Sequence, residues 1–308
     1  MNLQTMEYIS ALARERSFTR AAEALHITQQ SLSGHIASVE QELGVQLVVR
    51  RVPLELTYAG QAFLRHAEAI RQEVLALRQE LCDITGEQRG QLRIGVAFTR
   101  SKAIMPDIVT AFQREYPNVE LCMLENANEK FHRALLDGEV DLAIANFPSA
   151  LPEIELEPFY HEDVVLLISR ALLRAHGLTP EQCVRAVQAE DYSVFRACPF
   201  LLGSRPQDIS GFAAQQALRS IGAPVRVPAR SDNADTMITL CERGCGVYFC
   251  SELLLRALRS GSQLQQMLTV RLPRRQAGEI RFAYRRKLYQ WQLIDAFIRI
   301  ARNTVQTG

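Results

Sequence analysis

The segment "SFTRAAEALHITQQSLSGHIASVEQELG", residues 17–44, has no lysine and only one arginine, Arg20. Its pattern nevertheless predicts two short helices around a tight turn, which is typical of a helix-turn-helix that reads DNA. Residues 1–57 carry five arginines against six acidic residues, whereas residues 269–308 carry nine basic residues against two acidic ones. The predicted DNA-reading segment is therefore not the basic part of the chain.

Other features that the sequence lacks argue against whole classes of protein. No apolar run reaches the roughly 18 residues that cross a bilayer, and the N-terminus lacks the basic-then-apolar order of a signal peptide. We therefore expect a cytoplasmic protein with no membrane partner. The chain contains no GxSxG, P-loop or dinucleotide motif, so neither enzyme activity nor a cofactor is expected.

The seven cysteines are scattered, with no CxxC pair, and no two histidines have metal-ligand spacing. This pattern argues against a bound metal such as structural zinc. Buried free thiols in a reducing compartment are the expected state. The alternative is a redox sensor at Cys198, because the neighbouring Arg196 would lower the pKa of its thiol.

Helix signals organise the first 57 residues. Asn2, Ser17 and Thr28 stand where side chains cap the starts of three helices, and Gly44 supplies a stop after the third. "QLVVRRVPLELT" follows and predicts two short strands around an Arg-Arg pair, as in a wing.

Apolar residues then recur at alternating spacings of four and three, which is the pattern of a coiled-coil helix. The predicted dimerisation residues are Phe63, Ala67, Ile70, Val74, Leu77, Leu81 and Ile84. The alternative is an amphipathic helix that packs only on its own domain. "TGEQRGQ", residues 85–91, predicts a hinge.

Strands and helices alternate from "QLRIGVAF" onwards, and a second block of this kind begins at "DVVLLISR". Apolar strands separated by helices favour a parallel sheet that is covered on both faces. At 308 residues, two or three domains are expected.

In this order the parts resemble the LysR-type transcriptional regulators over essentially the whole chain. The segments that carry the resemblance are "SFTRAAEALHITQ", "SLSGHIASVEQELGVQL", "LTYAG", "GQLRIGV", "AFQREYPNVEL", "LLDGEVDLAI" and "CERGCGV". The resemblance implies a multidomain α/β protein: a winged helix-turn-helix at 1–57, a linker and dimerisation helix at 58–88, and an effector-binding domain at 89–308. That domain would have a periplasmic-binding-protein-like fold of two Rossmann-like lobes, one of about 91–162 with 269–301 and the other of about 163–268.

The implied partners are double-stranded DNA with dyad symmetry, a small-molecule effector and further copies of the chain as a homodimer or homotetramer. RNA polymerase is a further candidate partner. Such proteins often carry a basic residue where Gly34 stands and a proline where Gln30 stands. Gly34 removes a phosphate or base contact and lowers helix propensity there.

The third predicted helix offers amides and hydroxyls in place of charge. Its first residues would contact base edges, and glutamine can pair with adenine. The expected DNA contacts are Arg20, Thr28, Gln29, Gln30, Ser31, Ser33, His35, Arg50 and Arg51. Because so few of them are charged, several linked copies are needed for a firm grip. The alternative is that each polar side chain is simply solvated.

Ligands of such sheets lie outside the carboxyl ends of strands, near helix N-termini. The expected effector contacts are Thr99, Ser101, Asn146, Phe147, Gly203, Ser204 and Asn233. Arg100, Lys102 and Arg205 nearby favour a small anion, although the two cations at 100 and 102 could simply face solvent. Phe147 would equally suit an apolar ligand. The alternatives are that these residues only cap helices, or that the sensor is degenerate.

Overall fold

The computed structural model describes residues 2–85, 89–148, 150–259, 261–274, 278–286 and 291–306. The chain divides into two compact units, Met1–Gln88 with Leu288–Trp291 and Arg89–Lys287 with Gln292–Gly308. Residues 86–88 of the predicted hinge lie outside the described residues.

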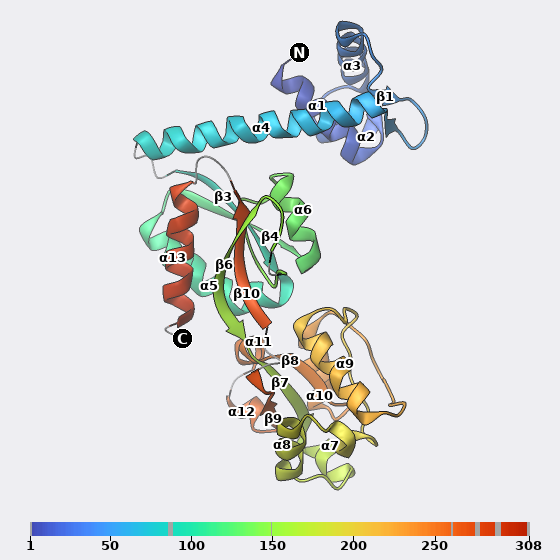
Figure 1. Ribbon diagram of the computed structural model, residues 1–308, viewed down its shortest axis with the longest axis vertical. Coiled ribbons are helices and arrows are strands. Elements are labelled where there is room, and N and C mark those ends of the chain that lie inside the picture. Colours follow the sequence, from blue (N-terminus) through green and yellow to red (C-terminus); the bar gives the residue numbers. More distant parts are fainter. Residues whose placement is uncertain are drawn as a thin grey trace. The chain divides into compact units, whose positions relative to one another are not determined.

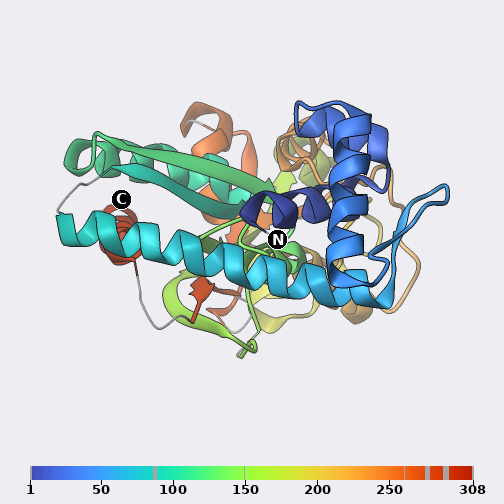
Figure 2. The same cartoon turned by 90° about the horizontal axis from the view of Figure 1, so that it is seen from above.

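The N-terminal unit follows the predicted order of helices and wing strands. Its elements are α1 (Leu3–Glu15), α2 (Phe18–Ala24), α3 (Gln29–Leu43), β1 (Val48–Val49), β2 (Glu55–Leu56) and α4 (Tyr58–Thr85). Each predicted cap is confirmed: the side chains of Asn2, Ser17 and Thr28 accept hydrogen bonds from backbone N–H groups three residues on. Gly44 ends α3 in the left-handed region, with φ of 69°. Figures 1 and 2 show α4 as one long continuous helix.

The first lobe of the second unit is built on a five-stranded sheet with the order β4-β3-β5-β10-β6. Its elements are β3 (Gly90–Ala97), α5 (Phe98–Glu115), β4 (Val119–Asn126), η1 (Asn128–Lys130), α6 (Phe131–Leu136), β5 (Leu142–Ala145), β6 (Ile154–Glu162), β10 (Gly278–Arg285) and α13 (Gln292–Gln306). In Figure 1, α5 and α13 cover one face and α6 covers the other. Every side chain of β5 is buried, so both faces of the sheet are covered at this central strand.

The second lobe has a three-stranded sheet with the order β8-β7-β9. Its elements are β7 (Val164–Ser169), α7 (Arg170–Ala175), α8 (Pro180–Ala189), η2 (Tyr192–Phe195), α9 (Ile209–Ile221), α10 (Ala234–Glu242), β8 (Tyr248–Ser251), α11 (Glu252–Leu258), α12 (Gly261–Leu264) and β9 (Met267–Arg271). Alternate side chains of β7 enter the apolar clusters on opposite faces, one with α9 and the other with α10.

Two sequence expectations need correction. The sheets are not wholly parallel: β3 runs parallel to β4 and β5, but β10 is antiparallel to both its neighbours, and β7 is antiparallel to β8 and β9. The second lobe also extends beyond residue 268, because β9 pairs with β7 as far as Arg271. Apolar strand sequences report burial on both faces, which is typical of parallel sheets but does not fix the direction of each strand.

Across the described residues, no helix is both long and apolar enough to span a membrane. The same residues contain no cluster of three or more side chains suited to hold a metal ion.

Candidate functional site

The first turn of α3 presents uncharged polar groups to solvent. Thr28, Gln29, Gln30 and Ser31 are all exposed. The Thr28 hydroxyl is held in place because it accepts the backbone N–H of Ser31 at 3.1 Å. The two glutamine amides are therefore accessible to solvent on the first turn of a capped helix.

His35 does not belong to this exposed face. Its Nε2 lies 2.9 Å from the Thr5 hydroxyl, and its ring meets Tyr8 edge-on at 4.9 Å. These contacts tie α3 to α1, and a base contact by His35 stays a prediction. The spacing could have shown this packing, since His35 lies three residues after Leu32 and beside Ile36, two fully buried residues.

The predicted phosphate-contacting arginines all have partners on their own unit. Arg50 donates to the Ser33 hydroxyl at 3.0 Å and lies over the Phe18 ring at 5.3 Å. Arg51 pairs with Glu55 on the neighbouring wing strand, and Arg20 donates to a main-chain carbonyl. All three remain exposed, so they are positioned side chains at the surface.

Gly34 lies exposed in α3, and a Cβ there would meet no atom within 4 Å. Its place in the helix therefore has open space for a larger side chain. The departure from the family pattern removes a possible charge without serving a packing need.

The heptad residues of α4 divide into two groups. Phe63 packs partly buried against the core of the N-terminal unit, and Ala67 is buried. Phe63 therefore has a packing role within its own unit, and its contact with a second copy stays a prediction. The C-terminal part of the pattern leaves large apolar side chains exposed: Ile70, Leu77, Leu81 and Ile84. We call these four residues the α4 seam.

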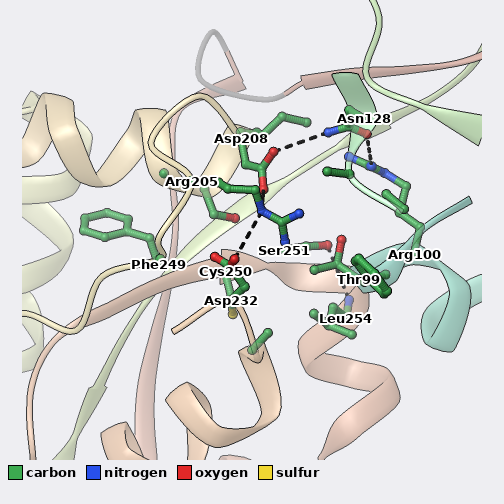
Figure 3. A pocket seen from close by; sticks show the side chains of 18 of the residues that line it. Thr99, Arg100, Asn128, Arg205, Asp208, Asp232, Phe249, Cys250, Ser251 and Leu254 are labelled. Carbon is green, nitrogen blue, oxygen red and sulfur yellow. Dashed lines mark hydrogen bonds and ion pairs between the residues drawn. The ribbon is translucent and has the colours of Figure 1, made fainter. Parts of the chain in front are cut away.

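A cavity of about 80 Å³ lies between the two lobes of the second unit (Figure 3). Its walls come from segments 97–100 and 126–128 of the first lobe and from parts of 201–214, 231–234 and 248–254 of the second. The first-lobe walls follow the carboxyl ends of β3 and β4, where α/β sheets bind ligands. We call this cavity the inter-lobe pocket.

Two of the predicted effector contacts, Thr99 and Gly203, line the inter-lobe pocket. Ser101 and Phe147 are not among its lining residues. The Ser101 hydroxyl donates to Glu125, and Phe147 is buried in the apolar core beside α6.

Asn146, Ser204 and Asn233 also lie outside the lining of the pocket. Asn146 donates its amide to the main chain of Glu279, and Ser204 donates its backbone N–H to Asp232. Asn233 caps α10. For these positions the capping or structural alternative holds, since a helix-start signal does not distinguish a cap from a ligand contact.

Sequence reasoning named both arginines of the pocket, Arg100 and Arg205, but missed the carboxylates of Glu162 and Asp208. Arg100 is buried and does not face solvent: its guanidinium donates to Glu162 at 2.8 Å and to Asn128 at 3.2 Å. Glu162 stands 62 residues away in the sequence, so no local pattern signals the pair.

A polar chain crosses the pocket from one lobe to the other. The Asn128 amide donates to Asp208 at 3.4 Å, and Arg205 Nε lies 3.3 Å from Asp208 and 3.7 Å from Asp232. Figure 3 shows these contacts as a continuous line around the cavity. Burial raises the pKa of Asp208, and the nearby Arg205 opposes that rise without cancelling it.

Cys198 does not have the environment of a reactive thiol. It is buried, and burial raises its pKa to about 11, with Cys183 adding to the rise. The redox alternative at this residue is therefore wrong in the direction of its pKa shift. The thiol is predominantly protonated at neutral pH.

Arginines of the basic C-terminal segment pair with acidic residues of their own unit. The pairs are Arg271–Glu252, Arg281–Glu279, Arg285–Glu153, Arg286–Glu155, Arg299–Glu115 and Arg302–Glu157. Their charge is thus balanced within the chain.

The chain matches two protein-family models in sequence. Residues 3–61 match the bacterial regulatory helix-turn-helix protein model of the lysR family, and residues 85–306 match the LysR substrate binding domain. A probable RuBisCO transcriptional regulator of Trieres chinensis is 32% identical over 55% of this chain and 56% of its own length, so that match spans only about half of the relative. The activator IlvY of Salmonella typhimurium is 26% identical over 98% of this chain and 100% of its own.

Solved structures share the fold along the whole chain. A full-length variant of OxyR from Pseudomonas aeruginosa superposes with a TM-score of 0.71 at 21% identity, over 98% of this chain and 95% of its own. CbnR complexed with its target DNA gives 0.63 at 21% identity, over 99% and 100%. With both family models in their expected places, the chain belongs to the LysR family of DNA-binding transcriptional regulators.

Proposed function

We propose that this regulator reads base sequence with uncharged side chains at the start of α3 and reaches a useful affinity only as a multimer. The observation that carries the proposal is the exposed set Thr28, Gln29, Gln30 and Ser31 beside the two wing arginines. An amide pairs with adenine through two hydrogen bonds and gives about 1–3 kcal/mol of discrimination per good pair.

Phosphate contacts come from the same surface. The free N–H groups at the start of α3 attract phosphate oxygens, and Arg50 and Arg51 extend from the adjacent wing. Each neutralised phosphate adds roughly 0.9 to the slope of log affinity against log salt. With about three cations per copy, a single copy would bind weakly and with a shallow salt dependence.

Multiplicity then supplies the missing affinity. The α4 seam leaves Leu77, Leu81 and Ile84 at least half exposed, which favours a second copy of the same helix as its cover. Linking two reading heads raises affinity by roughly 10²–10⁴ without any new base contact. A homodimer through α4, and a homotetramer of two such dimers, are the proposed assemblies.

The inter-lobe pocket is the proposed effector site. A ligand that binds one arrangement of the lobes better than another shifts the population of that arrangement. Because the sensor and the reading heads share a chain, the same ligand changes DNA affinity by linkage.

The experiment is a footprint of the purified protein on DNA upstream of its own gene, across a salt titration. We expect a protected region of several helical turns with a dyad, whose length changes when an effector is added. Absence of protection even at low salt would overturn the proposed DNA reading.

Variants of α3 test the residues. Gln29→Ala and Gln30→Ala should each lower specific affinity by about 10-fold to 100-fold while non-specific binding is unchanged. Gln41→Ala, an exposed amide near the end of the same helix, is the matched control. Equal losses on specific and random DNA would refute base readout by these amides.

A further inference from the structure

The cations of the inter-lobe pocket are not equally available to a ligand. Arg100 is 4% exposed and its carboxylate partner Glu162 is 6% exposed, at 2.8 Å. This pair neutralises itself, and Asn128 occupies a further donor of Arg100. The charge of Arg100 is therefore already balanced in the wall of the pocket, and of its donors the buried Nε has no hydrogen-bond partner among the described residues.

Arg205 differs, because only its Nε faces carboxylates, namely those of Asp208 and Asp232. Its two terminal nitrogens have no partner among the described residues. Figure 3 shows this end of the guanidinium directed toward Thr99 and Ser251 across the pocket. The two terminal N–H groups of a guanidinium form a fork that donates to both oxygens of a carboxylate. The hydroxyls of Thr99 and Ser251 would be further donors to the same carboxylate.

The carboxylates of the pocket outnumber its cations, and two of them, Asp208 and Asp232, lie at the Nε of Arg205. Three carboxylates line the pocket, those of Glu162, Asp208 and Asp232, against the guanidiniums of Arg100 and Arg205. A ligand that is only anionic would add a second uncompensated negative charge beside the half-buried Asp208. A positive group placed at Asp208 and Asp232 would instead balance the excess charge.

We infer that the pocket takes a small zwitterion, with its carboxylate on Arg205 and its protonated amine between Asp208 and Asp232, as in an α-amino acid. The inference rests on the proposed effector role of this pocket and specifies its ligand class. The cavity of about 80 Å³ suits a small molecule. Gly211 keeps the wall tight, since a Cβ there would lie 2.3 Å from the Arg205 carbonyl oxygen.

Calorimetric titration of the full-length protein tests the inference with matched sets of ligands. Each set comprises one of the twenty common amino acids, its deaminated acid and its decarboxylated amine, such as alanine, propionate and ethylamine. We expect at least one amino acid to bind about tenfold or more tighter than both of its analogues, because each charge-assisted hydrogen bond is lost separately. An analogue that equals its amino acid, or no amino acid binding at millimolar concentration, would overturn the zwitterion.

Variants locate each end of the ligand. Asp208→Asn should weaken the amino acid about tenfold or more and leave the deaminated acid unchanged or tighter, whereas Arg205→Gln should weaken both acids. Asp232→Asn provides a second test of the amine end should Asp208→Asn fold poorly. Asp107→Asn, an exposed carboxylate on α5, is the control. Unchanged selectivity in both aspartate variants would contradict the placement of the amine.

The DNA footprint separates this inference from the proposed function. An intact footprint together with no binding of any amino acid overturns the ligand class alone. Loss of the footprint in the unmodified protein overturns the proposed DNA reading, whatever the pocket binds.

Discussion

The first turn of α3 and the inter-lobe pocket distribute charge in opposite ways. The start of α3 is exposed and uncharged from Thr28 to Ser31. The pocket holds five charged side chains around about 80 Å³, most of them paired with one another. Of these two sites, the charge lies in the pocket, where water is scarce and a pair is strong. It is absent from the start of α3, where salt would screen it. In the proposed function, DNA reading by α3 therefore depends on geometry and copy number, and ligand binding in the pocket depends on electrostatic matching.

The largest expected effect comes from breaking the copy number on which α3 depends. Leu77→Glu with Leu81→Glu places charges in the α4 seam and should disperse the multimer. Affinity for operator DNA should then fall by roughly 10²–10⁴, because the second head no longer binds intramolecularly. Sedimentation and DNA titration measure the two effects. Ala69→Glu, exposed on α4 outside the seam, should change neither, and a monomer that keeps its full affinity for DNA would contradict the comparison.

Breaking the charge pairing of the pocket should instead lower the free energy of unfolding. Glu162→Ala leaves the buried Arg100 guanidinium without its carboxylate, so unfolding should become easier by about 3–5 kcal/mol. Urea denaturation measures this loss. Glu155→Ala removes the exposed partner of Arg286 and should cost at most about 1 kcal/mol. Similar losses in the two variants would show that the pocket pair is no more than a surface contact.

Local signals account for what sequence predicted well. Asn2, Ser17 and Thr28 each accept a hydrogen bond from a backbone N–H only three residues on. Their capping roles can therefore be predicted from the neighbouring sequence. The Arg100–Glu162 pair joins residues 62 positions apart, and His35 finds its partner 30 positions away. Such pairs depend on tertiary packing, which local propensity does not specify.

The same distinction explains the effector candidates. Thr99 and Gly203 line the pocket because strand ends and helix starts converge on clefts in such sheets. Asn233 and Ser204 carry the same local signal, yet each forms its hydrogen bond within its own lobe. Asn233 accepts from the backbone N–H of Thr236, and Ser204 donates its backbone N–H to Asp232. The charge pairs of the pocket close within each lobe, and the contact that joins the lobes there, from Asn128 to Asp208, spans 80 positions and had no local sequence signature.

Smaller effects are expected when Gly34 of α3 is replaced by a larger or a charged residue. Gly34→Ala should stabilise the N-terminal unit by about 0.5–1 kcal/mol, since a glycine inside a helix carries that penalty and a Cβ there meets open space. Gly34→Arg should raise affinity for random DNA and steepen the salt slope by about one. Ser38→Arg, an exposed position further along α3, serves as control. An equal gain in DNA affinity in Ser38→Arg would mean that an added charge acts without regard to its position on α3.

The smallest effect concerns the acidity of the pocket. Burial raises the pKa of Asp208, so the folded state binds this proton more tightly than the unfolded state does. The stability from that proton is fully present below the unfolded pKa and is lost as pH rises through the folded pKa. Asp208→Asn cannot ionise and should escape this loss.

Its melting temperature relative to the unmodified protein should therefore increase as pH rises from strongly acidic toward neutral. Scanning calorimetry of both proteins at matched ionic strength measures the difference, with Asp107→Asn as the exposed comparison. A difference that shrinks with rising pH would mean that the Arg205 pairing outweighs burial, and the pocket would then hold its excess negative charge without strain. Such a pocket would lose its electrostatic reason to prefer an amine, so this small shift bears directly on the zwitterion.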